Sequence, residues 1–199
     1  MSERDAAPPL LDARQVTVRF GGLIAVDAVD ANFRRGELVG IIGPNGAGKT
    51  TFFNAISGVV APTSGRLLAD GVDLTGKAPH RYAAHGIART FQTPRVFADL
   101  PVRDNIAFGL KFAGRRPRRY LFWGEEASVP WALRTPESIL TLIGLDALAG
   151  LPAAAITPSQ QRLLEIGMAL GARPRVLLLD EVAAGLTHAE VELTAQLIR

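Results

Sequence analysis

Residues 43–50 read Gly43-Pro44-Asn45-Gly46-Ala47-Gly48-Lys49-Thr50 and match the pattern G-x-x-x-x-G-K-[S/T]. A short apolar run, residues 37–42, precedes them, and a helical pattern, residues 49–56, follows. Glycines let the backbone turn so that successive N–H groups converge on phosphate oxygens, and the helix start adds a partial positive charge. Lys49 would reach the β- and γ-phosphates, and the Thr50 hydroxyl would reach magnesium. These residues therefore predict a loop that binds ATP with Mg²⁺.

Composition and charge are those of an ordinary globular chain. Hydrophobic residues make up 48% of the 199 residues, and the formal net charge of +3 is too small to indicate a nucleic-acid partner. No apolar run approaches the ~18 residues of a membrane-spanning helix. Residues 1–9 lack the apolar core of a secretion signal. The absence of cysteine excludes disulfides and thiolate metal sites. We therefore expect a cytoplasmic protein that binds no nucleic acid.

Strand patterns alternate with helix patterns along the chain. Alternating residues, short apolar runs between turns, and one hairpin pattern predict strands at 14–20, 25–33, 37–42, 64–74 and 175–179. Helix signals and capping boxes predict helices at 49–56, 136–143 and 158–170, and from 187 onward. This alternation predicts an α/β fold with a parallel sheet covered by helices on both faces. The mostly helical stretch from about 75 to 170 would be an inserted subdomain.

Two acids, Asp180 and Glu181, follow the predicted strand 175–179. A buried parallel strand places such residues at the carboxyl edge of the sheet, where the phosphate loop also lies. Asp180 would hold the water shell of magnesium, and Glu181 would polarise the attacking water. Two solvated acids at a strand end are the alternative explanation, since acids often follow buried strands.

The combined motifs resemble those of ATP-binding cassette (ABC) ATPases. The order and spacing of GPNGAGKTT (43–51), RTFQ (89–92) and LLLDE (177–181) match along nearly the whole chain. Two further segments, RFGGLIAV at 19–26 and IARTFQTPRVF at 87–97, are similar to those of the branched-chain amino acid importer subfamily.

The resemblance implies a fold and a division of the chain. It implies a P-loop NTPase (RecA-like) core with an antiparallel β edge and an inserted helical subdomain. We expect the first part of the core at residues 1–91, the helical subdomain at 92–160 and the second part of the core at 161–199. The chain ends at Arg199, before the position of the family's switch histidine. We therefore expect the last strands of the core to be missing.

The resemblance also implies roles for individual residues. The catalytic residues would be Glu181, Lys49 and Gln92. The residues that bind magnesium would be Thr50, Gln92 and Asp180. The nucleotide would contact Phe20, which would stack on adenine, and Gly43, Pro44, Asn45, Gly46, Ala47, Gly48, Lys49, Thr50, Thr51, Thr157 and Gln160. From local pattern alone, Phe20 is equally compatible with a core residue at a strand end. From its local pattern alone, Gln92 would be a solvated residue in a turn.

The function implied is that of an ATP-binding and hydrolysing motor subunit of an importer, for branched-chain or related amino acids. ATP and Mg²⁺ would be bound between this chain and a second ATPase subunit, identical or different. The other partners implied are integral membrane permease subunits and, indirectly, a solute-binding protein. Such a subunit sits peripherally on the cytoplasmic face of the membrane. A soluble cassette of DNA repair or translation is less favoured, since the chain carries no long insertion.

One motif departs from the family pattern. The family's Leu-Ser-Gly-Gly-Gln signature aligns with residues 156–160, where Pro158 and Ser159 replace both glycines. Proline has no N–H, and serine adds a side chain where the backbone should approach the partner's γ-phosphate. We expect these changes to weaken the contact across the dimer, and a helix start that is merely well capped is the alternative explanation. The alternative function is thus a nucleotide-binding cassette with little or no turnover, as a regulatory, degenerate or truncated copy.

Overall fold

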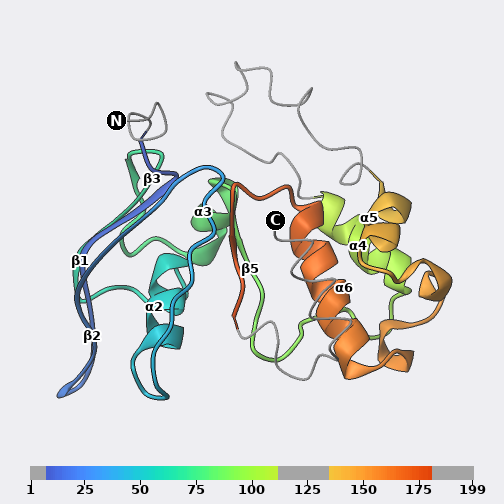
Figure 1. Cartoon of the computed structure of the whole chain (residues 1–199), viewed down its shortest axis with the longest axis horizontal. Helices are drawn as coiled ribbons and strands as arrows, with labels where there is room; N and C mark the ends of the chain where they lie inside the picture. The colour runs from blue at the N-terminus through green and yellow to red at the C-terminus, as the bar shows by residue number, and fades with distance from the viewer. Residues whose placement is uncertain (1–7, 112–134, 181–199) are drawn as a thin grey trace. The chain divides into compact units, whose positions relative to one another are not determined.

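The computed structural model of the chain describes residues 8–111 and 135–180 (Figure 1). The chain divides into two compact units between Ala88 and Arg89. Glu181 and the helix expected from residue 187 lie outside the described residues. Within the described ranges, no helix is both long and apolar enough to cross a bilayer.

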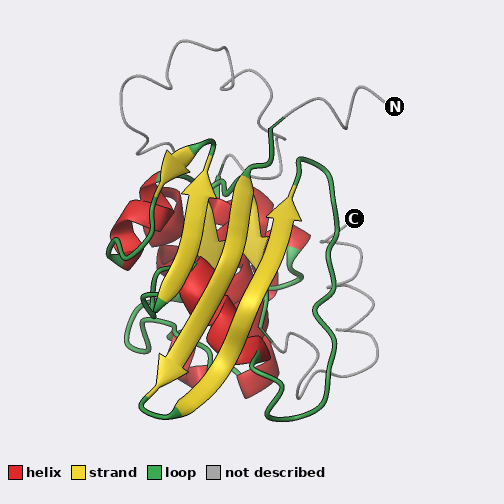
Figure 2. Cartoon of the chain, turned by 90° about the vertical axis from the view of Figure 1, so that its left-hand side faces the viewer, coloured by secondary structure: helices red, strands yellow, loops and turns green. Residues whose placement is uncertain are grey.

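The first unit is built on a four-stranded antiparallel sheet, seen face-on in Figure 2. Its strands are β1 (Leu11–Phe20), β2 (Leu23–Phe33), β3 (Ser64–Ala69) and β4 (Val72–Asp73), in the order β2-β1-β3-β4. The apolar residues of β1 from Leu11 to Val18 are buried, and so is Thr17. The strands expected at 14–20 and 25–33 and the hairpin at 64–74 are confirmed, and they form the antiparallel β edge.

A β-bulge at Gln15 interrupts the alternation of β1. The pairing of β1 with β2 shifts register between Ala13 and Val16, and Gln15 has a φ of 48°. Asp30 holds the bulge, since it accepts hydrogen bonds from the Gln15 N–H at 2.8 Å and from the Gln15 side-chain amide. The extra residue allows Ala13 and Val16, three positions apart, both to be buried.

Two helices complete the described part of the first unit. Helix α2 (Lys49–Ile56) buries Phe52, Ala55 and Ile56 and contacts β1 and β2. The predicted bounds of this helix, 49–56, are confirmed. Helix α3 (Pro79–Ala84) buries Tyr82, whose hydroxyl donates a 2.8 Å hydrogen bond to the carbonyl oxygen of Leu74.

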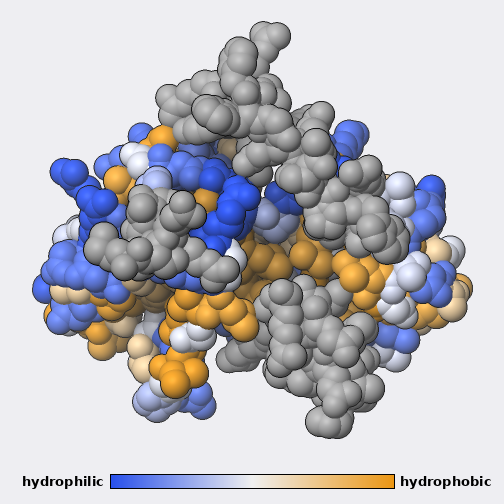
Figure 3. Space-filling model, turned by 45° about the horizontal axis from the view of Figure 1, so that its top comes forward, coloured by the Kyte–Doolittle hydropathy of each residue, from blue (hydrophilic) through white to orange (hydrophobic). Residues whose placement is uncertain are grey.

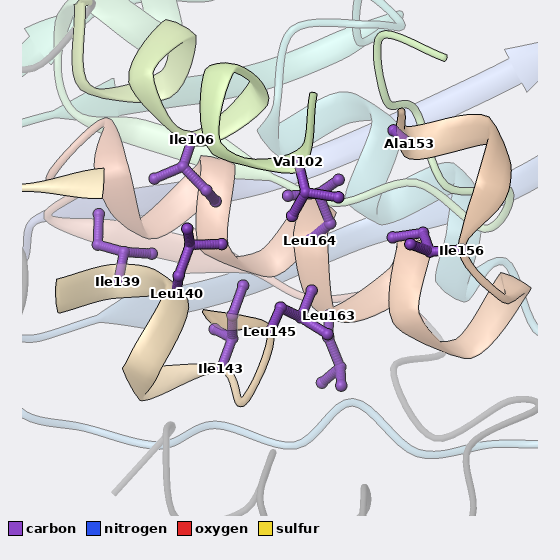
Figure 4. Close-up of a cluster of buried hydrophobic side chains, with 10 residues drawn as sticks. All are labelled: Val102, Ile106, Ile139, Leu140, Ile143, Leu145, Ala153, Ile156, Leu163 and Leu164. Atoms are coloured by element: carbon purple, nitrogen blue, oxygen red, sulfur yellow. The ribbon is translucent and has the colours of Figure 1, made fainter. Parts of the chain in front are cut away.

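The second unit is mainly helical. Helices α4 (Val102–Lys111), α5 (Pro136–Leu142) and α6 (Pro158–Gly171) pack on one another, with short 3-10 turns at Asp146–Leu148 and Ala153–Ala155. Strands β5 (Ile87–Arg89) and β6 (Val176–Leu178) form a two-stranded sheet. Figure 4 shows the buried cluster between the helices: Val102, Ile106, Ile139, Leu140, Ile143, Leu145, Ala153, Ile156, Leu163 and Leu164. The helices predicted at 136–143 and 158–170 are confirmed to within one residue.

Glycine sets the distance between α4 and α6. A Cβ atom on Gly109 of α4 would lie 2.4 Å from the carbonyl oxygen of Met168 on α6, closer than real contacts allow. A Cβ atom on Gly167 would meet the methyl ends of Ile143 and Ile106 at 2.7 and 2.8 Å. The contact at Gly109 is with rigid backbone, so only glycine allows the two helices to approach this closely.

The prediction of a buried strand at residues 37–42 is wrong. The segment forms no strand, and Leu38, Val39 and Ile42 are exposed by 75%, 48% and 94%. An apolar run becomes a buried strand only when neighbouring strands flank it, and none pairs with it within the described ranges. Apolar residues at the surface of the molecule are orange in Figure 3.

We expect Gly109→Ala to lower the free energy of unfolding by about 1–3 kcal/mol, because the added methyl forces α4 away from the backbone of α6. Gly150→Ala is the matched control, since nothing lies within 4 Å of a Cβ atom at that position. Urea unfolding followed by circular dichroism measures both variants. Equal stability of the two would contradict the close approach of α4 and α6.

Burial raises the pKa of Tyr82 to about 12, and the charge of Asp73 adds to the shift. The native state therefore retains the phenolic proton where the unfolded chain loses it. The resulting stabilisation is fully present below pH ~10 and is lost as pH rises towards 12. We expect the tyrosinate absorbance of the Tyr120→Phe variant, which retains only Tyr82, to rise near pH 12. A midpoint at pH ~10 in the folded protein would show that Tyr82 is solvated.

Candidate functional site

The phosphate loop of the first unit needs glycine at two positions. Gly46 and Gly48 have φ of 83° and 79°, in the left-handed region that favours glycine. A Cβ atom on Gly48 would also lie 2.1 Å from the carbonyl oxygen of Ala25 on β2. The loop is exposed from Gly43 to Ala47. Its backbone is therefore shaped by glycine and accessible to a ligand.

The side chain of Lys49 folds back over this loop. Its Nζ donates 2.7 Å hydrogen bonds to the carbonyl oxygens of Gly43 and Pro44. An ammonium group has three hydrogens, so these two bonds leave a third donor for an anion at the loop. The contacts hold the positive charge of Lys49 at the predicted phosphate position.

Helix α2 starts without a side-chain cap. Its N-cap is Gly48, and its first turn contains no acidic residue. The first N–H groups of a helix have no partner inside the helix, and they carry the positive end of its dipole. The exposed Thr50 lies in this first turn, and Thr51 follows it. The helix start is therefore suited to an anion, with a hydroxyl beside it that suits Mg²⁺.

Phe20 lies at the end of β1, where the chain turns at Gly21 into β2. Its side chain is 52% exposed, so it is not the core residue that the local pattern alone allowed. Its exposure leaves a ring face available for stacking, and the role at adenine stays a prediction.

Asp180 lies in the second unit, two residues beyond β6. It is only 8% exposed, and its N–H donates a 3.3 Å hydrogen bond to the hydroxyl of Thr90. Its carboxylate lies 3.6 Å from the guanidinium of Arg89, whose side chain is 9% exposed. Burial lowers the pKa of Arg89, while the charges of Asp180 and Glu165 oppose this shift. Asp180 is thus a buried, paired carboxylate and not a solvated acid.

Gln92 lies just beyond β5 and is exposed. Its carbonyl oxygen accepts a hydrogen bond from Arg162 of α6. The next charged residue of α6, Glu165, accepts hydrogen bonds from the N–H groups of Phe91 and Arg95 on either side of Gln92. Burial raises the pKa of Glu165, against the effect of these N–H groups and of the charges of Arg162 and Arg95.

Thr157 and Gln160 form the predicted capping box at the start of α6. The Thr157 hydroxyl accepts a 3.2 Å hydrogen bond from the Gln160 N–H, and the Gln160 side-chain oxygen accepts one of 2.9 Å from the Thr157 N–H. Both bonds use oxygen as the acceptor. The hydroxyl proton and the amide NH₂ of these side chains are donors that the capping box does not use.

The predicted site residues thus fall into two groups. Residue 20 and residues 43–51 belong to the first unit, whereas Gln92, Thr157, Gln160 and Asp180 belong to the second. Glu181 lies outside the described residues. Thr50 and Asp180 offer the hydroxyl and carboxylate oxygens that Mg²⁺ prefers.

Sequence reasoning missed Arg89, Arg162 and Glu165. The signal for the last two was an arginine and a glutamate three positions apart in the largely apolar stretch RLLEIGMAL, residues 162–170 of α6. Charges on a face that packs into a core need specific partners. Nothing local marked Arg89, because its partner Asp180 is about 90 residues away in the sequence.

Comparison with known proteins gives consistent matches. The family described as "ABC transporter" matches residues 26–184. The chain is 35% identical over 191 residues to the high-affinity branched-chain amino acid transport ATP-binding protein BraF of Pseudomonas aeruginosa, covering 92% of this chain and 73% of BraF.

Two solved structures are similar in fold. The ADP conformation of an ATP-binding cassette of an ABC transporter has a TM-score of 0.76 at 30% identity, covering 96% of this chain and 76% of that one. A dimeric post-hydrolysis state of another ATP-binding cassette, bound to ADP and Pi, has a TM-score of 0.76 at 25% identity, covering 94% of this chain and 81% of that one.

Loss of the cap at α6 should destabilise the second unit. We expect Thr157→Ala to lower the free energy of unfolding by about 1 kcal/mol, because the Gln160 N–H loses its acceptor. Thr135→Ala is the matched control, since Thr135 forms the same kind of capping box at α5. Thermal unfolding of both variants checks the expectation. An unchanged Tm for Thr157→Ala beside a lowered Tm for Thr135→Ala would show that the α6 cap contributes nothing.

Proposed function

Because the chain belongs to the ATP-binding cassette (ABC) transporter family, we propose that it is the ATP-hydrolysing motor subunit of an importer. The family establishes an ATPase with a P-loop NTPase fold. The observation that carries the motor proposal is the phosphate loop, where Lys49 is held over a glycine turn at an uncapped helix start. This arrangement concentrates positive charge at one exposed place, as a triphosphate requires.

Residues of the loop bind and orient the phosphates in this proposal. The N–H groups of residues 43–51 donate to phosphate oxygens, and Lys49 exchanges its carbonyl partners for the β- and γ-phosphates. Phe20 stacks on adenine. Thr50, Gln92 and Asp180 would hold Mg²⁺ directly or through its water. When bound, the ion would supply positive charge to the phosphates.

The attacking water needs a group that takes its proton. Glu181 fills this role, because it follows Asp180 directly and a carboxylate accepts a proton as the bond to phosphorus forms. Lys49 and Gln92 stabilise the charge that develops on the transferred group.

A second ATPase subunit, identical or different, would complete the site. The solved cassette with ADP and Pi is a dimer, which supports this arrangement. Thr157 and Gln160 at the start of α6 are the residues that would contact the nucleotide held by the partner. The donors left unused by their capping box are suited to the γ-phosphate.

An exposed apolar surface in the second unit is the proposed contact with the membrane permease subunits. Phe97, Leu100 and Phe108 are each exposed by about 40%, and the rings of Phe97 and Phe108 pack edge to face at 4.5 Å between centroids. Buried Asn105 stabilises the surface, because its side chain bonds the main chain of Phe97 and Leu100. Exposed aromatic residues on a loop that is held by hydrogen bonds are typical of binding surfaces.

The cargo we propose is branched-chain or related amino acids, on the basis of the printed function of BraF. A solute-binding protein would select this cargo outside the membrane, whereas the present chain would lie peripherally on the cytoplasmic face. No nucleic-acid partner is proposed, since the formal net charge is only +3.

A second candidate is a cassette that binds nucleotide with little or no turnover. Pro158 at the first position of α6 has no N–H to offer a phosphate, and Ser159 replaces a glycine of the family signature. Both changes weaken the expected contact with the partner's nucleotide.

Mg-ATP binding and turnover by the 199-residue chain test the proposal. We expect measurable binding with slow turnover, and we expect Lys49→Ala to weaken binding by at least about tenfold, through loss of a charge-assisted contact. Glu181→Gln should retain binding and abolish turnover. Lys77→Ala is the matched control, because Lys77 is an exposed lysine of the same unit outside the loop.

The outcomes separate the two candidates. Turnover lost in both Lys49→Ala and Glu181→Gln supports the motor subunit. Binding that Lys49→Ala weakens, without any turnover by the unaltered chain, supports the second candidate. Binding that Lys49→Ala leaves unchanged would exclude both.

A further inference from the structure

Helix α6 carries two buried charges that the reaction as proposed does not use. Arg162 and Glu165 are only 6% and 5% exposed, and their neighbours Leu163, Leu164 and Ile166 belong to the core. Burying a charge without a partner is costly. These two side chains therefore need specific partners, and those partners show what the charges do.

The partners are main-chain groups of residues 91–95. Oε1 of Glu165 accepts hydrogen bonds from the N–H of Phe91 at 3.2 Å and of Arg95 at 3.1 Å. The guanidinium of Arg162 donates to the carbonyl oxygens of Phe91 and Gln92. The negative side chain thus meets two N–H dipoles, and the positive side chain meets two carbonyl dipoles. Each charged side chain therefore bonds main-chain groups whose facing partial charge is opposite to its own.

The same loop is also fixed through the ring of Phe91. The guanidinium carbons of Arg89 and Arg95 lie 4.7 and 5.1 Å from the ring centroid, within the range of cation–π attraction. Gln92, next in the chain, is held by its carbonyl oxygen while its residue is exposed. The backbone on which Gln92 stands is therefore fixed from α6.

We propose that Arg162 and Glu165 are positioning residues that clamp the main chain of residues 91–95 and so set where the Gln92 side chain is presented. The clamp makes the loop and α6 one rigid element, so that Gln92 follows any movement of the helix that begins at Thr157. The part played by Gln92 in catalysis rests on the proposed function, whereas the clamp itself does not.

Amide hydrogen exchange tests the clamp directly in the full chain. We expect Glu165→Ala to accelerate exchange of the Phe91 and Arg95 amides by at least about tenfold, because both lose their acceptor. Glu165→Gln retains a side-chain oxygen and should stay within about threefold of the unaltered chain. Glu137→Ala is the control, since it removes an exposed carboxylate of the same unit, paired with Arg103. Unchanged exchange in Glu165→Ala would overturn the clamp.

Turnover tests whether the clamp acts through Gln92. We expect Glu165→Ala and Arg162→Ala each to lower kcat by about tenfold with less than about a twofold change in KM, and Arg162→Lys to fall between. In a Gln92→Ala background, Glu165→Ala should cause no further loss, because both changes remove the same interaction. Losses that multiply in the double variant would show a merely structural role and overturn the positioning proposal.

The two tests also separate this inference from the proposed function. A chain that neither binds nor hydrolyses Mg-ATP contradicts the proposed function and, with it, the catalytic part of the inference. Exchange at Phe91 and Arg95 still decides the clamp in that case. Normal turnover with unchanged exchange in Glu165→Ala would leave the proposed function standing and remove the clamp.

Discussion

Unpaired main-chain N–H groups must find an acceptor, and this requirement shapes both units of the protein. In the second unit, α5 and α6 satisfy their first N–H groups with capping boxes, and Glu165 satisfies those of Phe91 and Arg95. In the first unit, α2 starts at a glycine with no side-chain cap and no acid in its first turn. Because no side chain accepts from the first N–H groups of α2, these donors suit the phosphate that we propose for this loop.

Local sequence predicted those parts of the fold that depend on neighbours a few residues away. The bounds of α2 followed from Gly48, and the start of α6 followed from Thr157 and Gln160, since a cap involves residues only three apart. The bulge at Gln15 escaped prediction because its acceptor, Asp30, lies on another strand. Residues 37–42 were misjudged for a related reason, since an apolar run alone does not supply flanking strands.

The features of the candidate site also divide into those that local sequence predicts and those that depend on distant residues. The phosphate loop could be predicted because its chemistry is contained in eight consecutive residues, and Asp180 because it follows an apolar run. The ion pair of Asp180 with Arg89 and the contacts of Arg162 and Glu165 with residues 91–95 could not. They join residues 70 or more positions apart, and no pattern within either segment specifies the other.

Helix α6 and residues 91–95 lie far apart in the sequence, and this affects how the protein folds. A capped helix such as α6 forms from local contacts within about a microsecond, whereas a contact between distant segments waits for the closure of a long loop. The bonds from Arg162 and Glu165 span 70 to 74 residues. Until they form, the two charges of α6 remain hydrated and keep that face of the helix out of the core. We therefore expect the segment around Gln92 to be fixed and α6 to be buried in the same late step of folding.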